Sequence, residues 1–190
     1  MMTVMSNDEQ HGDVAATAFS IQVEEDPLSR PQVKELLEHH MRQMQQLSPC
    51  GGCNYLDLRG FVDSSVKVFT LWHDGSVLVG CGALQELDDS HGELKSLRTV
   101  EGWERRGCGR RLVQHMLDVS RRERGYTRIS LETGSTEPFQ PAVRLYESMG
   151  FQRCEAFGQY ALRKSAGSCG ESMGSGSGSS SFNVYFTIEL

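Results

Sequence analysis

The stretch Trp103-Glu104-Arg105-Arg106-Gly107-Cys108-Gly109-Arg110-Arg111 places four arginines and two glycines at the start of a predicted helix. A helix N-terminus carries a positive partial charge, so each exposed cation there costs roughly 0.3–1 kcal/mol. The arrangement becomes favourable when an anion binds there, because free backbone N–H groups hold the anion and glycines let the backbone come close to it. The stretch therefore predicts an anion site, and the phosphates of a nucleotide-type cofactor are the expected ligand.

Two common phosphate-binding motifs do not fit this stretch. Gly102-x-x-x-x-Gly107 imitates the start of a P-loop, but Cys108-Gly109 follows in place of the Lys-Ser/Thr pair that supplies charge and a metal ligand. A Rossmann dinucleotide motif needs a third glycine where Leu112 stands, and it follows a parallel strand. The strand before this stretch belongs to an antiparallel series, so both motifs are excluded.

Upstream, the sequence predicts a helix and that antiparallel series. In the helix, Val33, Leu37, His40 and Met44 recur at helical spacing and are interpreted as core residues. Asp74-Gly75 separates two runs of β-forming residues and predicts a tight hairpin. The expected elements are a strand at 19–23, helices at 27–47 and 56–61, and strands at 66–72, 76–84 and 93–100.

Downstream, strands and helices alternate. Gly125 and Gly150 are the expected C-terminal stops of two helices, and the last run of alternating apolar and polar residues is too short to form a domain, so it must return to the main sheet. The expected elements are helices at 107–124 and 141–149, strands at 127–133, 151–154, 159–162 and 182–190, and a Gly/Ser-rich loop at 165–181.

Together these elements predict an α+β (mixed α/β) fold, with a central, mostly antiparallel twisted sheet flanked by helices. Residues 19–190 are expected to form one domain, because 190 residues are enough for a single core. Residues 1–18 have no apolar pattern and are interpreted as a flexible N-terminal tail.

Charge and hydropathy limit the partners. The net charge is −6 at pH 7, so the arginines form a local basic spot on an acidic protein, whereas a nucleic-acid binder presents a broad basic face. The longest apolar run lies near 76–84 and is far shorter than the about 20 residues of a membrane span. The charge distribution therefore leads us to expect no nucleic-acid partner. Because the apolar runs are short and the N-terminus lacks a signal-peptide pattern, we also expect no membrane association and a cytoplasmic location.

The cysteines do not indicate a metal site. Cys50 and Cys53 form a C-x-x-C pair, but no second pair follows at zinc-ribbon spacing, so no metal is expected. Cys108 lies between two glycines, and no histidine stands near it in sequence to activate the thiol. A covalent cysteine mechanism is therefore not expected.

Two segments resemble the signatures of the GNAT superfamily of N-acetyltransferases. The first is Glu-Leu-Lys-Ser-Leu-Arg-Thr-Val at 93–100 with Arg-Arg-Gly-Cys-Gly-Arg-Arg-Leu at 105–112, which is similar to the strand and Gln/Arg-x-x-Gly-x-Gly/Ala loop of the acetyl-CoA motif. The second, at 142–151, is similar to the signature Ala-x-x-Leu-Tyr-Glu-x-x-Gly-Phe. Two matching segments in the right order make the resemblance specific for this superfamily. The residues of these segments resemble those of a subgroup of small, poorly characterised GNAT proteins. The similarity covers about 19–190 except the Gly/Ser tract.

The resemblance implies acetyl-CoA as the cosubstrate. The backbone of Leu97, Arg98 and Thr99 matches the strand segment that pairs with the pantetheine arm in this family. Glu104 stands where the family usually carries Gln or Arg, and Phe139 where many relatives carry asparagine, so neither is assigned a contact. The phosphate contacts are assigned to Arg105, Arg106, Gly107, Cys108, Gly109 and Arg110.

The resemblance also implies direct acyl transfer, which needs a base for the amine and an acid for the leaving thiolate. A simple alkyl amine has a pKa of about 10.4, so a base helps to make it neutral. Glu93 occupies the strand position where some family members place that base, and Glu132 is a lesser candidate. Tyr146 matches the usual general acid of the family.

The predicted function is acetyl transfer from acetyl-CoA to an amine of a small-molecule acceptor, by a monomer or homodimer. The alternative is a catalytically weak or inactive CoA-binding sensor or interaction module of the same fold, which Glu104 and Phe139 leave open. We expect the acceptor to be determined by the early helices, the loop near 48–63, residues 157–160 and the Gly/Ser tract, and none of these segments carries a motif that names it.

Overall fold

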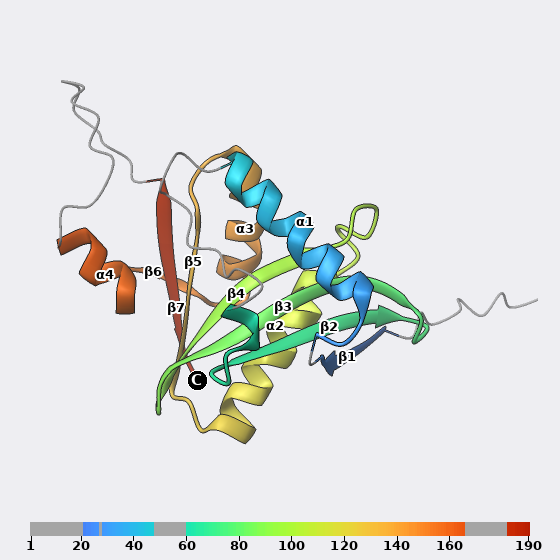
Figure 1. The fold of residues 1–190 in the computed structure, drawn as a ribbon. Helices are drawn as coiled ribbons and strands as arrows, with labels where there is room; N and C mark the ends of the chain where they lie inside the picture. The colour runs from blue at the N-terminus through green and yellow to red at the C-terminus, as the bar shows by residue number, and fades with distance from the viewer. Residues whose placement is uncertain (1–20, 27, 48–59, 166–181) are drawn as a thin grey trace, which may run out of the picture.

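A seven-stranded sheet in the order β1-β2-β3-β4-β5-β7-β6 forms the centre of the structure (Figure 1). The computed structural model describes residues 21–26, 28–47, 60–165 and 182–190. The strands are β1 (Ile21–Glu25), β2 (Val66–His73), β3 (Val77–Asp88), β4 (His91–Thr99), β5 (Arg128–Gly134), β6 (Gln152–Cys154) and β7 (Asn183–Glu189). The helices are α1 (Pro31–Leu47), α2 (Cys108–Val119), α3 (Gln140–Ser148) and α4 (Gly158–Ser165), with short helical turns at Gly60–Val62, Ser120–Arg124 and Glu137–Phe139.

The sheet is mostly antiparallel, as predicted. Strands β1 to β4 form a continuous antiparallel series, and β7 pairs antiparallel with both β5 and β6. The pairing of β4 with β5 is parallel and joins these two halves. The crossover between β4 and β5 contains α2, which is the connection that a parallel pair requires.

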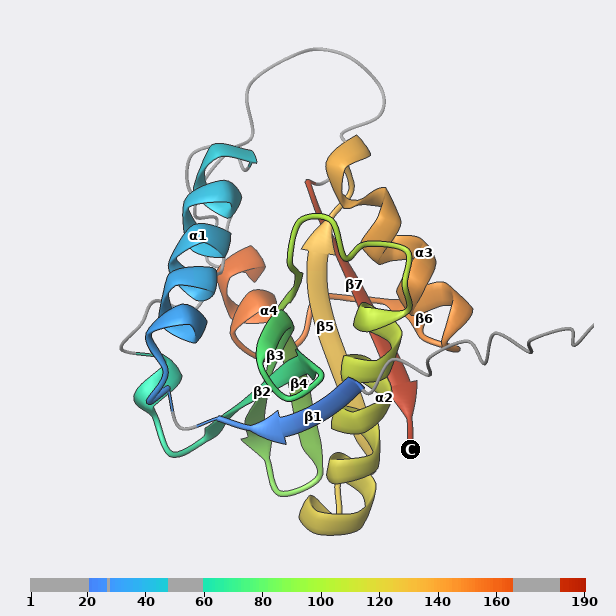
Figure 2. The same cartoon turned by 90° about the vertical axis from the view of Figure 1, so that its right-hand side faces the viewer.

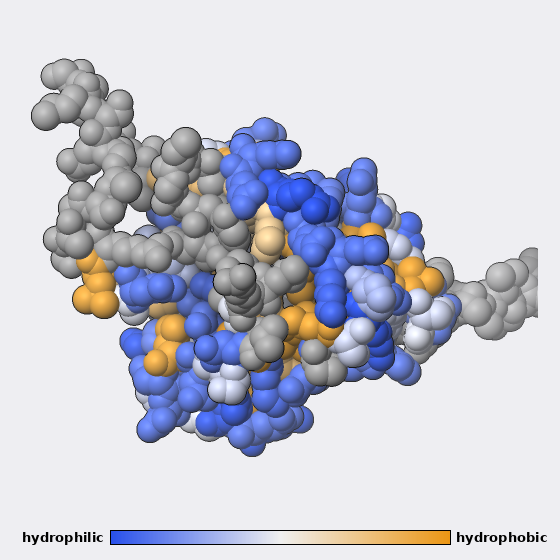
Figure 3. Space-filling model, in the orientation of Figure 1, coloured by the Kyte–Doolittle hydropathy of each residue, from blue (hydrophilic) through white to orange (hydrophobic). Residues whose placement is uncertain are grey.

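Helices cover both faces of the sheet. Figure 2 shows α1 and α4 on one side and α2 and α3 on the other. Val33 and Leu37 of α1 pack against one face, in a cluster with Val68, Trp72 and Ala83. On the other face, the apolar side of α2 packs with side chains of β2 to β5, α3 and β7. Figure 3 shows the outward side of α1 as hydrophilic, with apolar side chains gathered below it.

Local sequence signals account for several element ends. Asp74 and Gly75 have φ values of 47° and 67°, the pair of left-handed residues that a type I′ hairpin turn requires. Helix α2 continues through a π turn over Ser120–Arg124 and stops at Gly125, whose φ is 69°. The predicted 107–124 helix is therefore confirmed, with a change of hydrogen-bond pattern in its last turn.

One predicted element is wrong. Residues 159–162, expected as a strand, belong to helix α4. Both edges of β7 are already paired, with β5 and β6, so this segment has no open edge to join there. Tyr160 is buried while Leu162 is 71% exposed, so the side chains do not share the single buried face that their strand-like spacing suggested.

Several predictions lie outside the described residues. These are the tail at 1–18, the Cys50–Cys53 pair, most of the helix at 56–61, and the Gly/Ser tract after Ser165. Of the expected short helix, the structure describes a 3-10 turn at Gly60–Val62. The last strand is confirmed, because β7 pairs with β5 from Asn183 to Glu189.

Candidate active site

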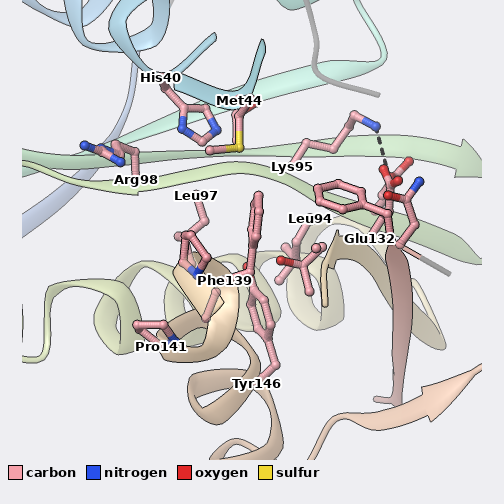
Figure 4. A pocket seen from close by; sticks show the side chains of 18 of the residues that line it. His40, Met44, Leu94, Lys95, Leu97, Arg98, Glu132, Phe139, Pro141 and Tyr146 are labelled. Atoms are coloured by element: carbon pink, nitrogen blue, oxygen red, sulfur yellow. Dashed lines mark hydrogen bonds and ion pairs between the residues drawn. The ribbon is translucent and has the colours of Figure 1, made fainter. Parts of the chain in front are cut away.

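A cavity of about 250 Å³ opens where β4 and β5 separate (Figure 4). The parallel pairing of the two strands ends at Leu94 and Leu131, although both strands continue. Beyond that point, the β4 edge that faces β5 has no strand partner in the described part of the chain. The cavity is lined by β4 from Glu93 to Arg98, β5 from Glu132 to Gly134, His40, Met44, Pro138, Phe139, Pro141, Ala142, Tyr146, Tyr160, Phe182 and Asn183.

A bulge in β4 decides which side chains reach the cavity from the sheet. Ala83 of β3 pairs with Lys95 and Cys81 pairs with Arg98, so β4 has one extra residue between these pairs. Ser96 takes up the bend with a φ of 52°. Regular alternation would point Lys95 and Arg98 to opposite faces, and the bulge brings both to the face that carries α1.

The predicted phosphate residues lie at the start of α2. Gly107 is the N-cap with a φ of 81°, and no described side chain caps the first turn. Arg105, Arg106 and Arg110 are exposed; Arg106 lies 4.8 Å over the Trp103 ring, and Arg110 donates to Ser148 Oγ at 2.7 Å. Backbone N–H groups and exposed cations thus share one end of the helix, as an anion site requires.

Glu104 has a different partner. Its carboxylate accepts the backbone N–H of Gly102 at 2.8 Å and so caps the turn that precedes the helix. This contact explains how an acidic residue is tolerated inside an arginine-rich stretch.

A buried ionic cluster surrounds Glu93. Its Oε1 accepts from Lys95 Nζ at 2.9 Å and from Tyr160 Oη at 2.5 Å, and Lys95 also donates to Tyr160 Oη at 2.7 Å. Burial and the charges of Glu93 and Glu132 raise the pKa of Tyr160, so its hydroxyl keeps the proton that it donates. The other oxygen, Glu93 Oε2, is buried and has no hydrogen-bond partner among the described residues.

Tyr146 enters the cavity from the opposite face of the sheet. Its ring packs edge-on against Phe151 at 5.7 Å, and Figure 4 shows it below Leu94 and Phe139. Burial raises the pKa of Tyr146, which therefore stays protonated at neutral pH. The Phe139 ring packs directly on the backbone of Gly134. Any larger residue there would clash, since a Cβ at that glycine would lie 2.4 Å from the ring.

Helix α1 contributes His40 and Met44 to the cavity. The spacing of these residues was interpreted as core; Val33, Leu37 and His40 are indeed buried, but His40 and Met44 also line the cavity. Burial, together with the nearby charge of Arg98, lowers the pKa of His40 to about 4. The imidazole is therefore neutral at pH 7, and its Nδ1 has no hydrogen-bond partner within the described chain.

A second polar cluster, near His91, is not a nucleophilic site. Arg128 can only donate, so its 3.1 Å contact makes His91 Nδ1 an acceptor and leaves the ring proton on Nε2. That nitrogen lies 2.7 Å from Ser130 Oγ and must donate to it, and Ser130 donates in turn to Thr187 Oγ1 at 3.1 Å. A serine nucleophile needs the histidine to accept its proton, so this chain of hydrogen bonds runs in the wrong direction.

The Cys108 thiol does not have the surroundings of a reactive cysteine. Cys108 is 2% exposed, and burial raises the pKa of its thiol, which disfavours the reactive thiolate. In the described ranges no group of three or more His, Cys, Asp or Glu is arranged to hold a metal ion.

No described helix is both long and apolar enough to cross a membrane.

Comparison with known proteins decides the family. Residues 31–151 match the profile of the Acetyltransferase (GNAT) family. The chain belongs to the GNAT family. It is 42% identical to the uncharacterized N-acetyltransferase YsnE of Bacillus subtilis over 135 residues, which cover 71% of this chain and 88% of YsnE. It is 39% identical to the uncharacterized N-acetyltransferase YedL of Escherichia coli over 140 residues, covering 74% of this chain and 87% of YedL.

Solved structures agree with the GNAT fold. A GNAT family acetyltransferase from Elizabethkingia anophelis, solved with acetyl-CoA bound, aligns with a TM-score of 0.58. The alignment covers 90% of this chain and 98% of that one at 16% identity. At this identity the likeness concerns the fold alone, and it extends over both halves of the sheet.

The predicted site residues fall into two groups in the structure. Glu93, Leu97, Arg98 and Tyr146 line the cavity, while the arginines and glycines of 105–110 lie at the start of α2. Lys95 was missed, and Tyr160 was predicted only as part of the acceptor segment 157–160, without its bond to Glu93. The spacing of Lys95 from Glu93 puts both on one strand face and offered a signal, whereas Tyr160 reaches Glu93 only through α4, which carried no motif.

Proposed function

We propose that this GNAT protein transfers an acetyl group directly from acetyl-CoA to an amine of a small-molecule acceptor. The observation that carries the proposal is the cavity at the β4–β5 separation, with Glu93 on one face of the sheet and Tyr146 on the other. Family membership and the relatives named as N-acetyltransferases support the acyl transfer. The cavity volume supports a small acceptor.

Acetyl-CoA is supported as the cosubstrate by the family and by a neighbour solved with acetyl-CoA bound. The residues present fit it. The open β4 edge at Leu97, Arg98 and Thr99 offers backbone groups to the pantetheine amides, as in an added strand. The uncapped N–H groups of Gly107, Cys108 and Gly109 and the side chains of Arg105, Arg106 and Arg110 would hold the phosphates.

Glu93 and Tyr146 would manage the two protons of the reaction. Glu93 Oε2 would take one proton from an amine that enters neutral, as its nitrogen bonds to the acetyl carbon, and would then return that proton to solvent; Oε1 is already engaged by Lys95 and Tyr160. Tyr146 gives one proton to the sulfur as the carbon–sulfur bond breaks, and regains it from solvent. Acetyl-CoA supplies the activated acetyl group, while the chain supplies position and proton transfer.

The test compares Tyr146→Phe with Tyr126→Phe. Tyr126 is also buried, but its hydroxyl donates to Glu86 at 2.9 Å, away from the cavity. We expect kcat for thiol release to fall roughly 100-fold in Tyr146→Phe, the usual size of a general-acid contribution. Acetyl-CoA affinity by calorimetry should stay unchanged, and Tyr126→Phe should change neither quantity.

The alternative function has its own outcome in the same test. Wild-type protein that binds acetyl-CoA but releases no thiol with any amine would be a CoA-binding sensor or interaction module. Wild-type protein that does not bind acetyl-CoA would contradict both functions. The cytoplasmic location, the monomer or homodimer, and the single domain over 19–190 stay predictions.

A further inference from the structure

Three residues that line the cavity each carry a buried polar atom without a hydrogen-bond partner in the described chain. These atoms are Glu93 Oε2, His40 Nδ1 and Arg98 Nε, and none has a partner in the described residues. His40 is 9% exposed and Glu93 is 1% exposed. Buried polar atoms are almost always paired, and a group of unpaired ones around one cavity indicates atoms that a ligand satisfies. The question is which ligand chemistry fits all three.

The three atoms lie at two different ends of the cavity. Figure 4 shows His40 descending from α1 near Arg98, while Lys95 points to the opposite side, toward the acidic residues. Glu93 belongs to that second end, where Lys95 and Tyr160 hold its other oxygen. A ligand that satisfies all three atoms must therefore carry two polar groups separated by a short linker.

The His40–Arg98 end selects an acceptor of hydrogen bonds. A guanidinium Nε can only donate, and the neutral His40 ring can donate from Nδ1. The charge of Arg98 disfavours a second cation beside it, as its effect on the His40 imidazole shows. No salt bridge joins Arg98 to a carboxylate of the described chain. A carboxylate on the ligand would satisfy both donors and balance the charge.

We propose that the acceptor is an amino acid-like molecule, whose carboxylate binds His40 and Arg98 while its amine faces Glu93. This inference rests on the proposed function and names the substrate class of the same site. The phosphates of acetyl-CoA are a poor match for the same donors, because their proposed position is at the start of α2, on the other face of the sheet. His40 and Arg98 are therefore specificity-determining residues for the acceptor.

The first experiment measures acceptor preference in a thiol-release assay. The panel contains α-, β-, γ- and ω-amino acids, each paired with its carboxamide, which lacks the negative charge, and the two members of a pair are compared at equal concentrations of neutral amine. The expected result is that the preferred acceptor is an acid, with kcat/KM at least roughly tenfold above its carboxamide, because a hydrogen bond to a charged group contributes about 1.5–3 kcal/mol. Equal rates within pairs, or a preference for the carboxamides, overturn the inference and leave the proposed function standing.

The second experiment uses a matched pair of variants, His40→Phe and His39→Phe. His39 is the exposed neighbour on α1, so the same change there controls for an effect on the helix. We expect the acid-to-carboxamide ratio of kcat/KM to fall toward one in His40→Phe and to stay at the wild-type value in His39→Phe. A fall in acetyl-CoA affinity with an unchanged ratio would instead assign His40 to the cosubstrate and overturn the inference.

The outcomes for inference and function are separable. Acetyl-CoA binding without turnover of any amino acid in the panel also contradicts the inference. Absence of acetyl-CoA binding contradicts the proposed function itself. If His40→Phe does not fold, Arg98→Lys is measured in its place, because it keeps the charge but removes the Nε donor, and the same fall in the ratio is expected.

Discussion

The proposed phosphate end and the proposed acceptor end of the site are built in different ways. The phosphate end comes from one continuous stretch, 103–111, that forms a turn and the start of α2. The acceptor end combines side chains from α1, β4, β5 and α4, so that Tyr160 bonds Glu93 across 67 positions. A site formed by one local segment can be predicted from the sequence, whereas a site formed by distant segments depends on how the sheet is assembled.

The two ends also differ in burial and therefore in what their charges do. Arg105, Arg106 and Arg110 are exposed, so solvent screens their charges. Glu93 and Lys95 are 1% and 8% exposed, so each depends on the other to offset its desolvation. Mutations at the first end should change binding, and mutations at the second end should change chemistry.

The largest expected effect sharpens this contrast at Glu93. We expect Glu93→Gln to lower kcat roughly 100-fold or more, since it removes a base of the usual catalytic weight while keeping the shape of the side chain. Acetyl-CoA affinity by calorimetry should remain at the wild-type value. The control is Glu86→Gln, which lies on β3 and bonds Tyr126 away from the cavity. A variant with wild-type kcat would remove Glu93 from the reaction.

A smaller effect is expected at the phosphate end. The double variant Arg106→Ala/Arg110→Ala should weaken acetyl-CoA binding roughly tenfold, because both arginines are exposed and solvent screens their attraction for the phosphates. Saturating acetyl-CoA should restore kcat. Arg121→Ala/Arg122→Ala removes two exposed arginines from the far end of the same helical segment and should leave the affinity unchanged. Equal losses in both double variants would mean that only net charge matters.

The smallest expected effect concerns Tyr160. Tyr160→Phe removes one of the two donors to Glu93 Oε1 and should lower kcat roughly tenfold, the loss expected for one hydrogen bond to a charged group. The KM for acetyl-CoA should not change. Tyr185→Phe, whose ring lies 5.6 Å from that of Tyr160, is the matched control. If both variants lose the same activity, the aromatic packing and not the hydroxyl positions Glu93.

The strand and helix pattern was largely predictable because it depends on local periodicity and on turn residues. The hairpin at Asp74-Gly75 and the end of the helix at Gly125 were predictable because glycine, and to a lesser degree aspartate, adopts positive φ at low cost. Helix α4 was not predictable in this way. Tyr160 and Leu162 have the spacing of a strand, but the structure places both in α4, where Tyr160 is buried and Leu162 is exposed.

The residues of the candidate site also divide into those that the sequence predicts and those that only the tertiary structure places. The sequence by itself determined the family, the arginine-rich helix start, and the candidates Glu93 and Tyr146, since these lie in contiguous motifs. The tertiary structure decided that Lys95 and Tyr160 hold Glu93 and that His40 faces the cavity. It also decided that Arg98 shares a face with Lys95, because one extra residue in β4 reverses the alternation that the sequence implies. Contacts across the sheet depend on register and bulges, and neither is written in a local pattern.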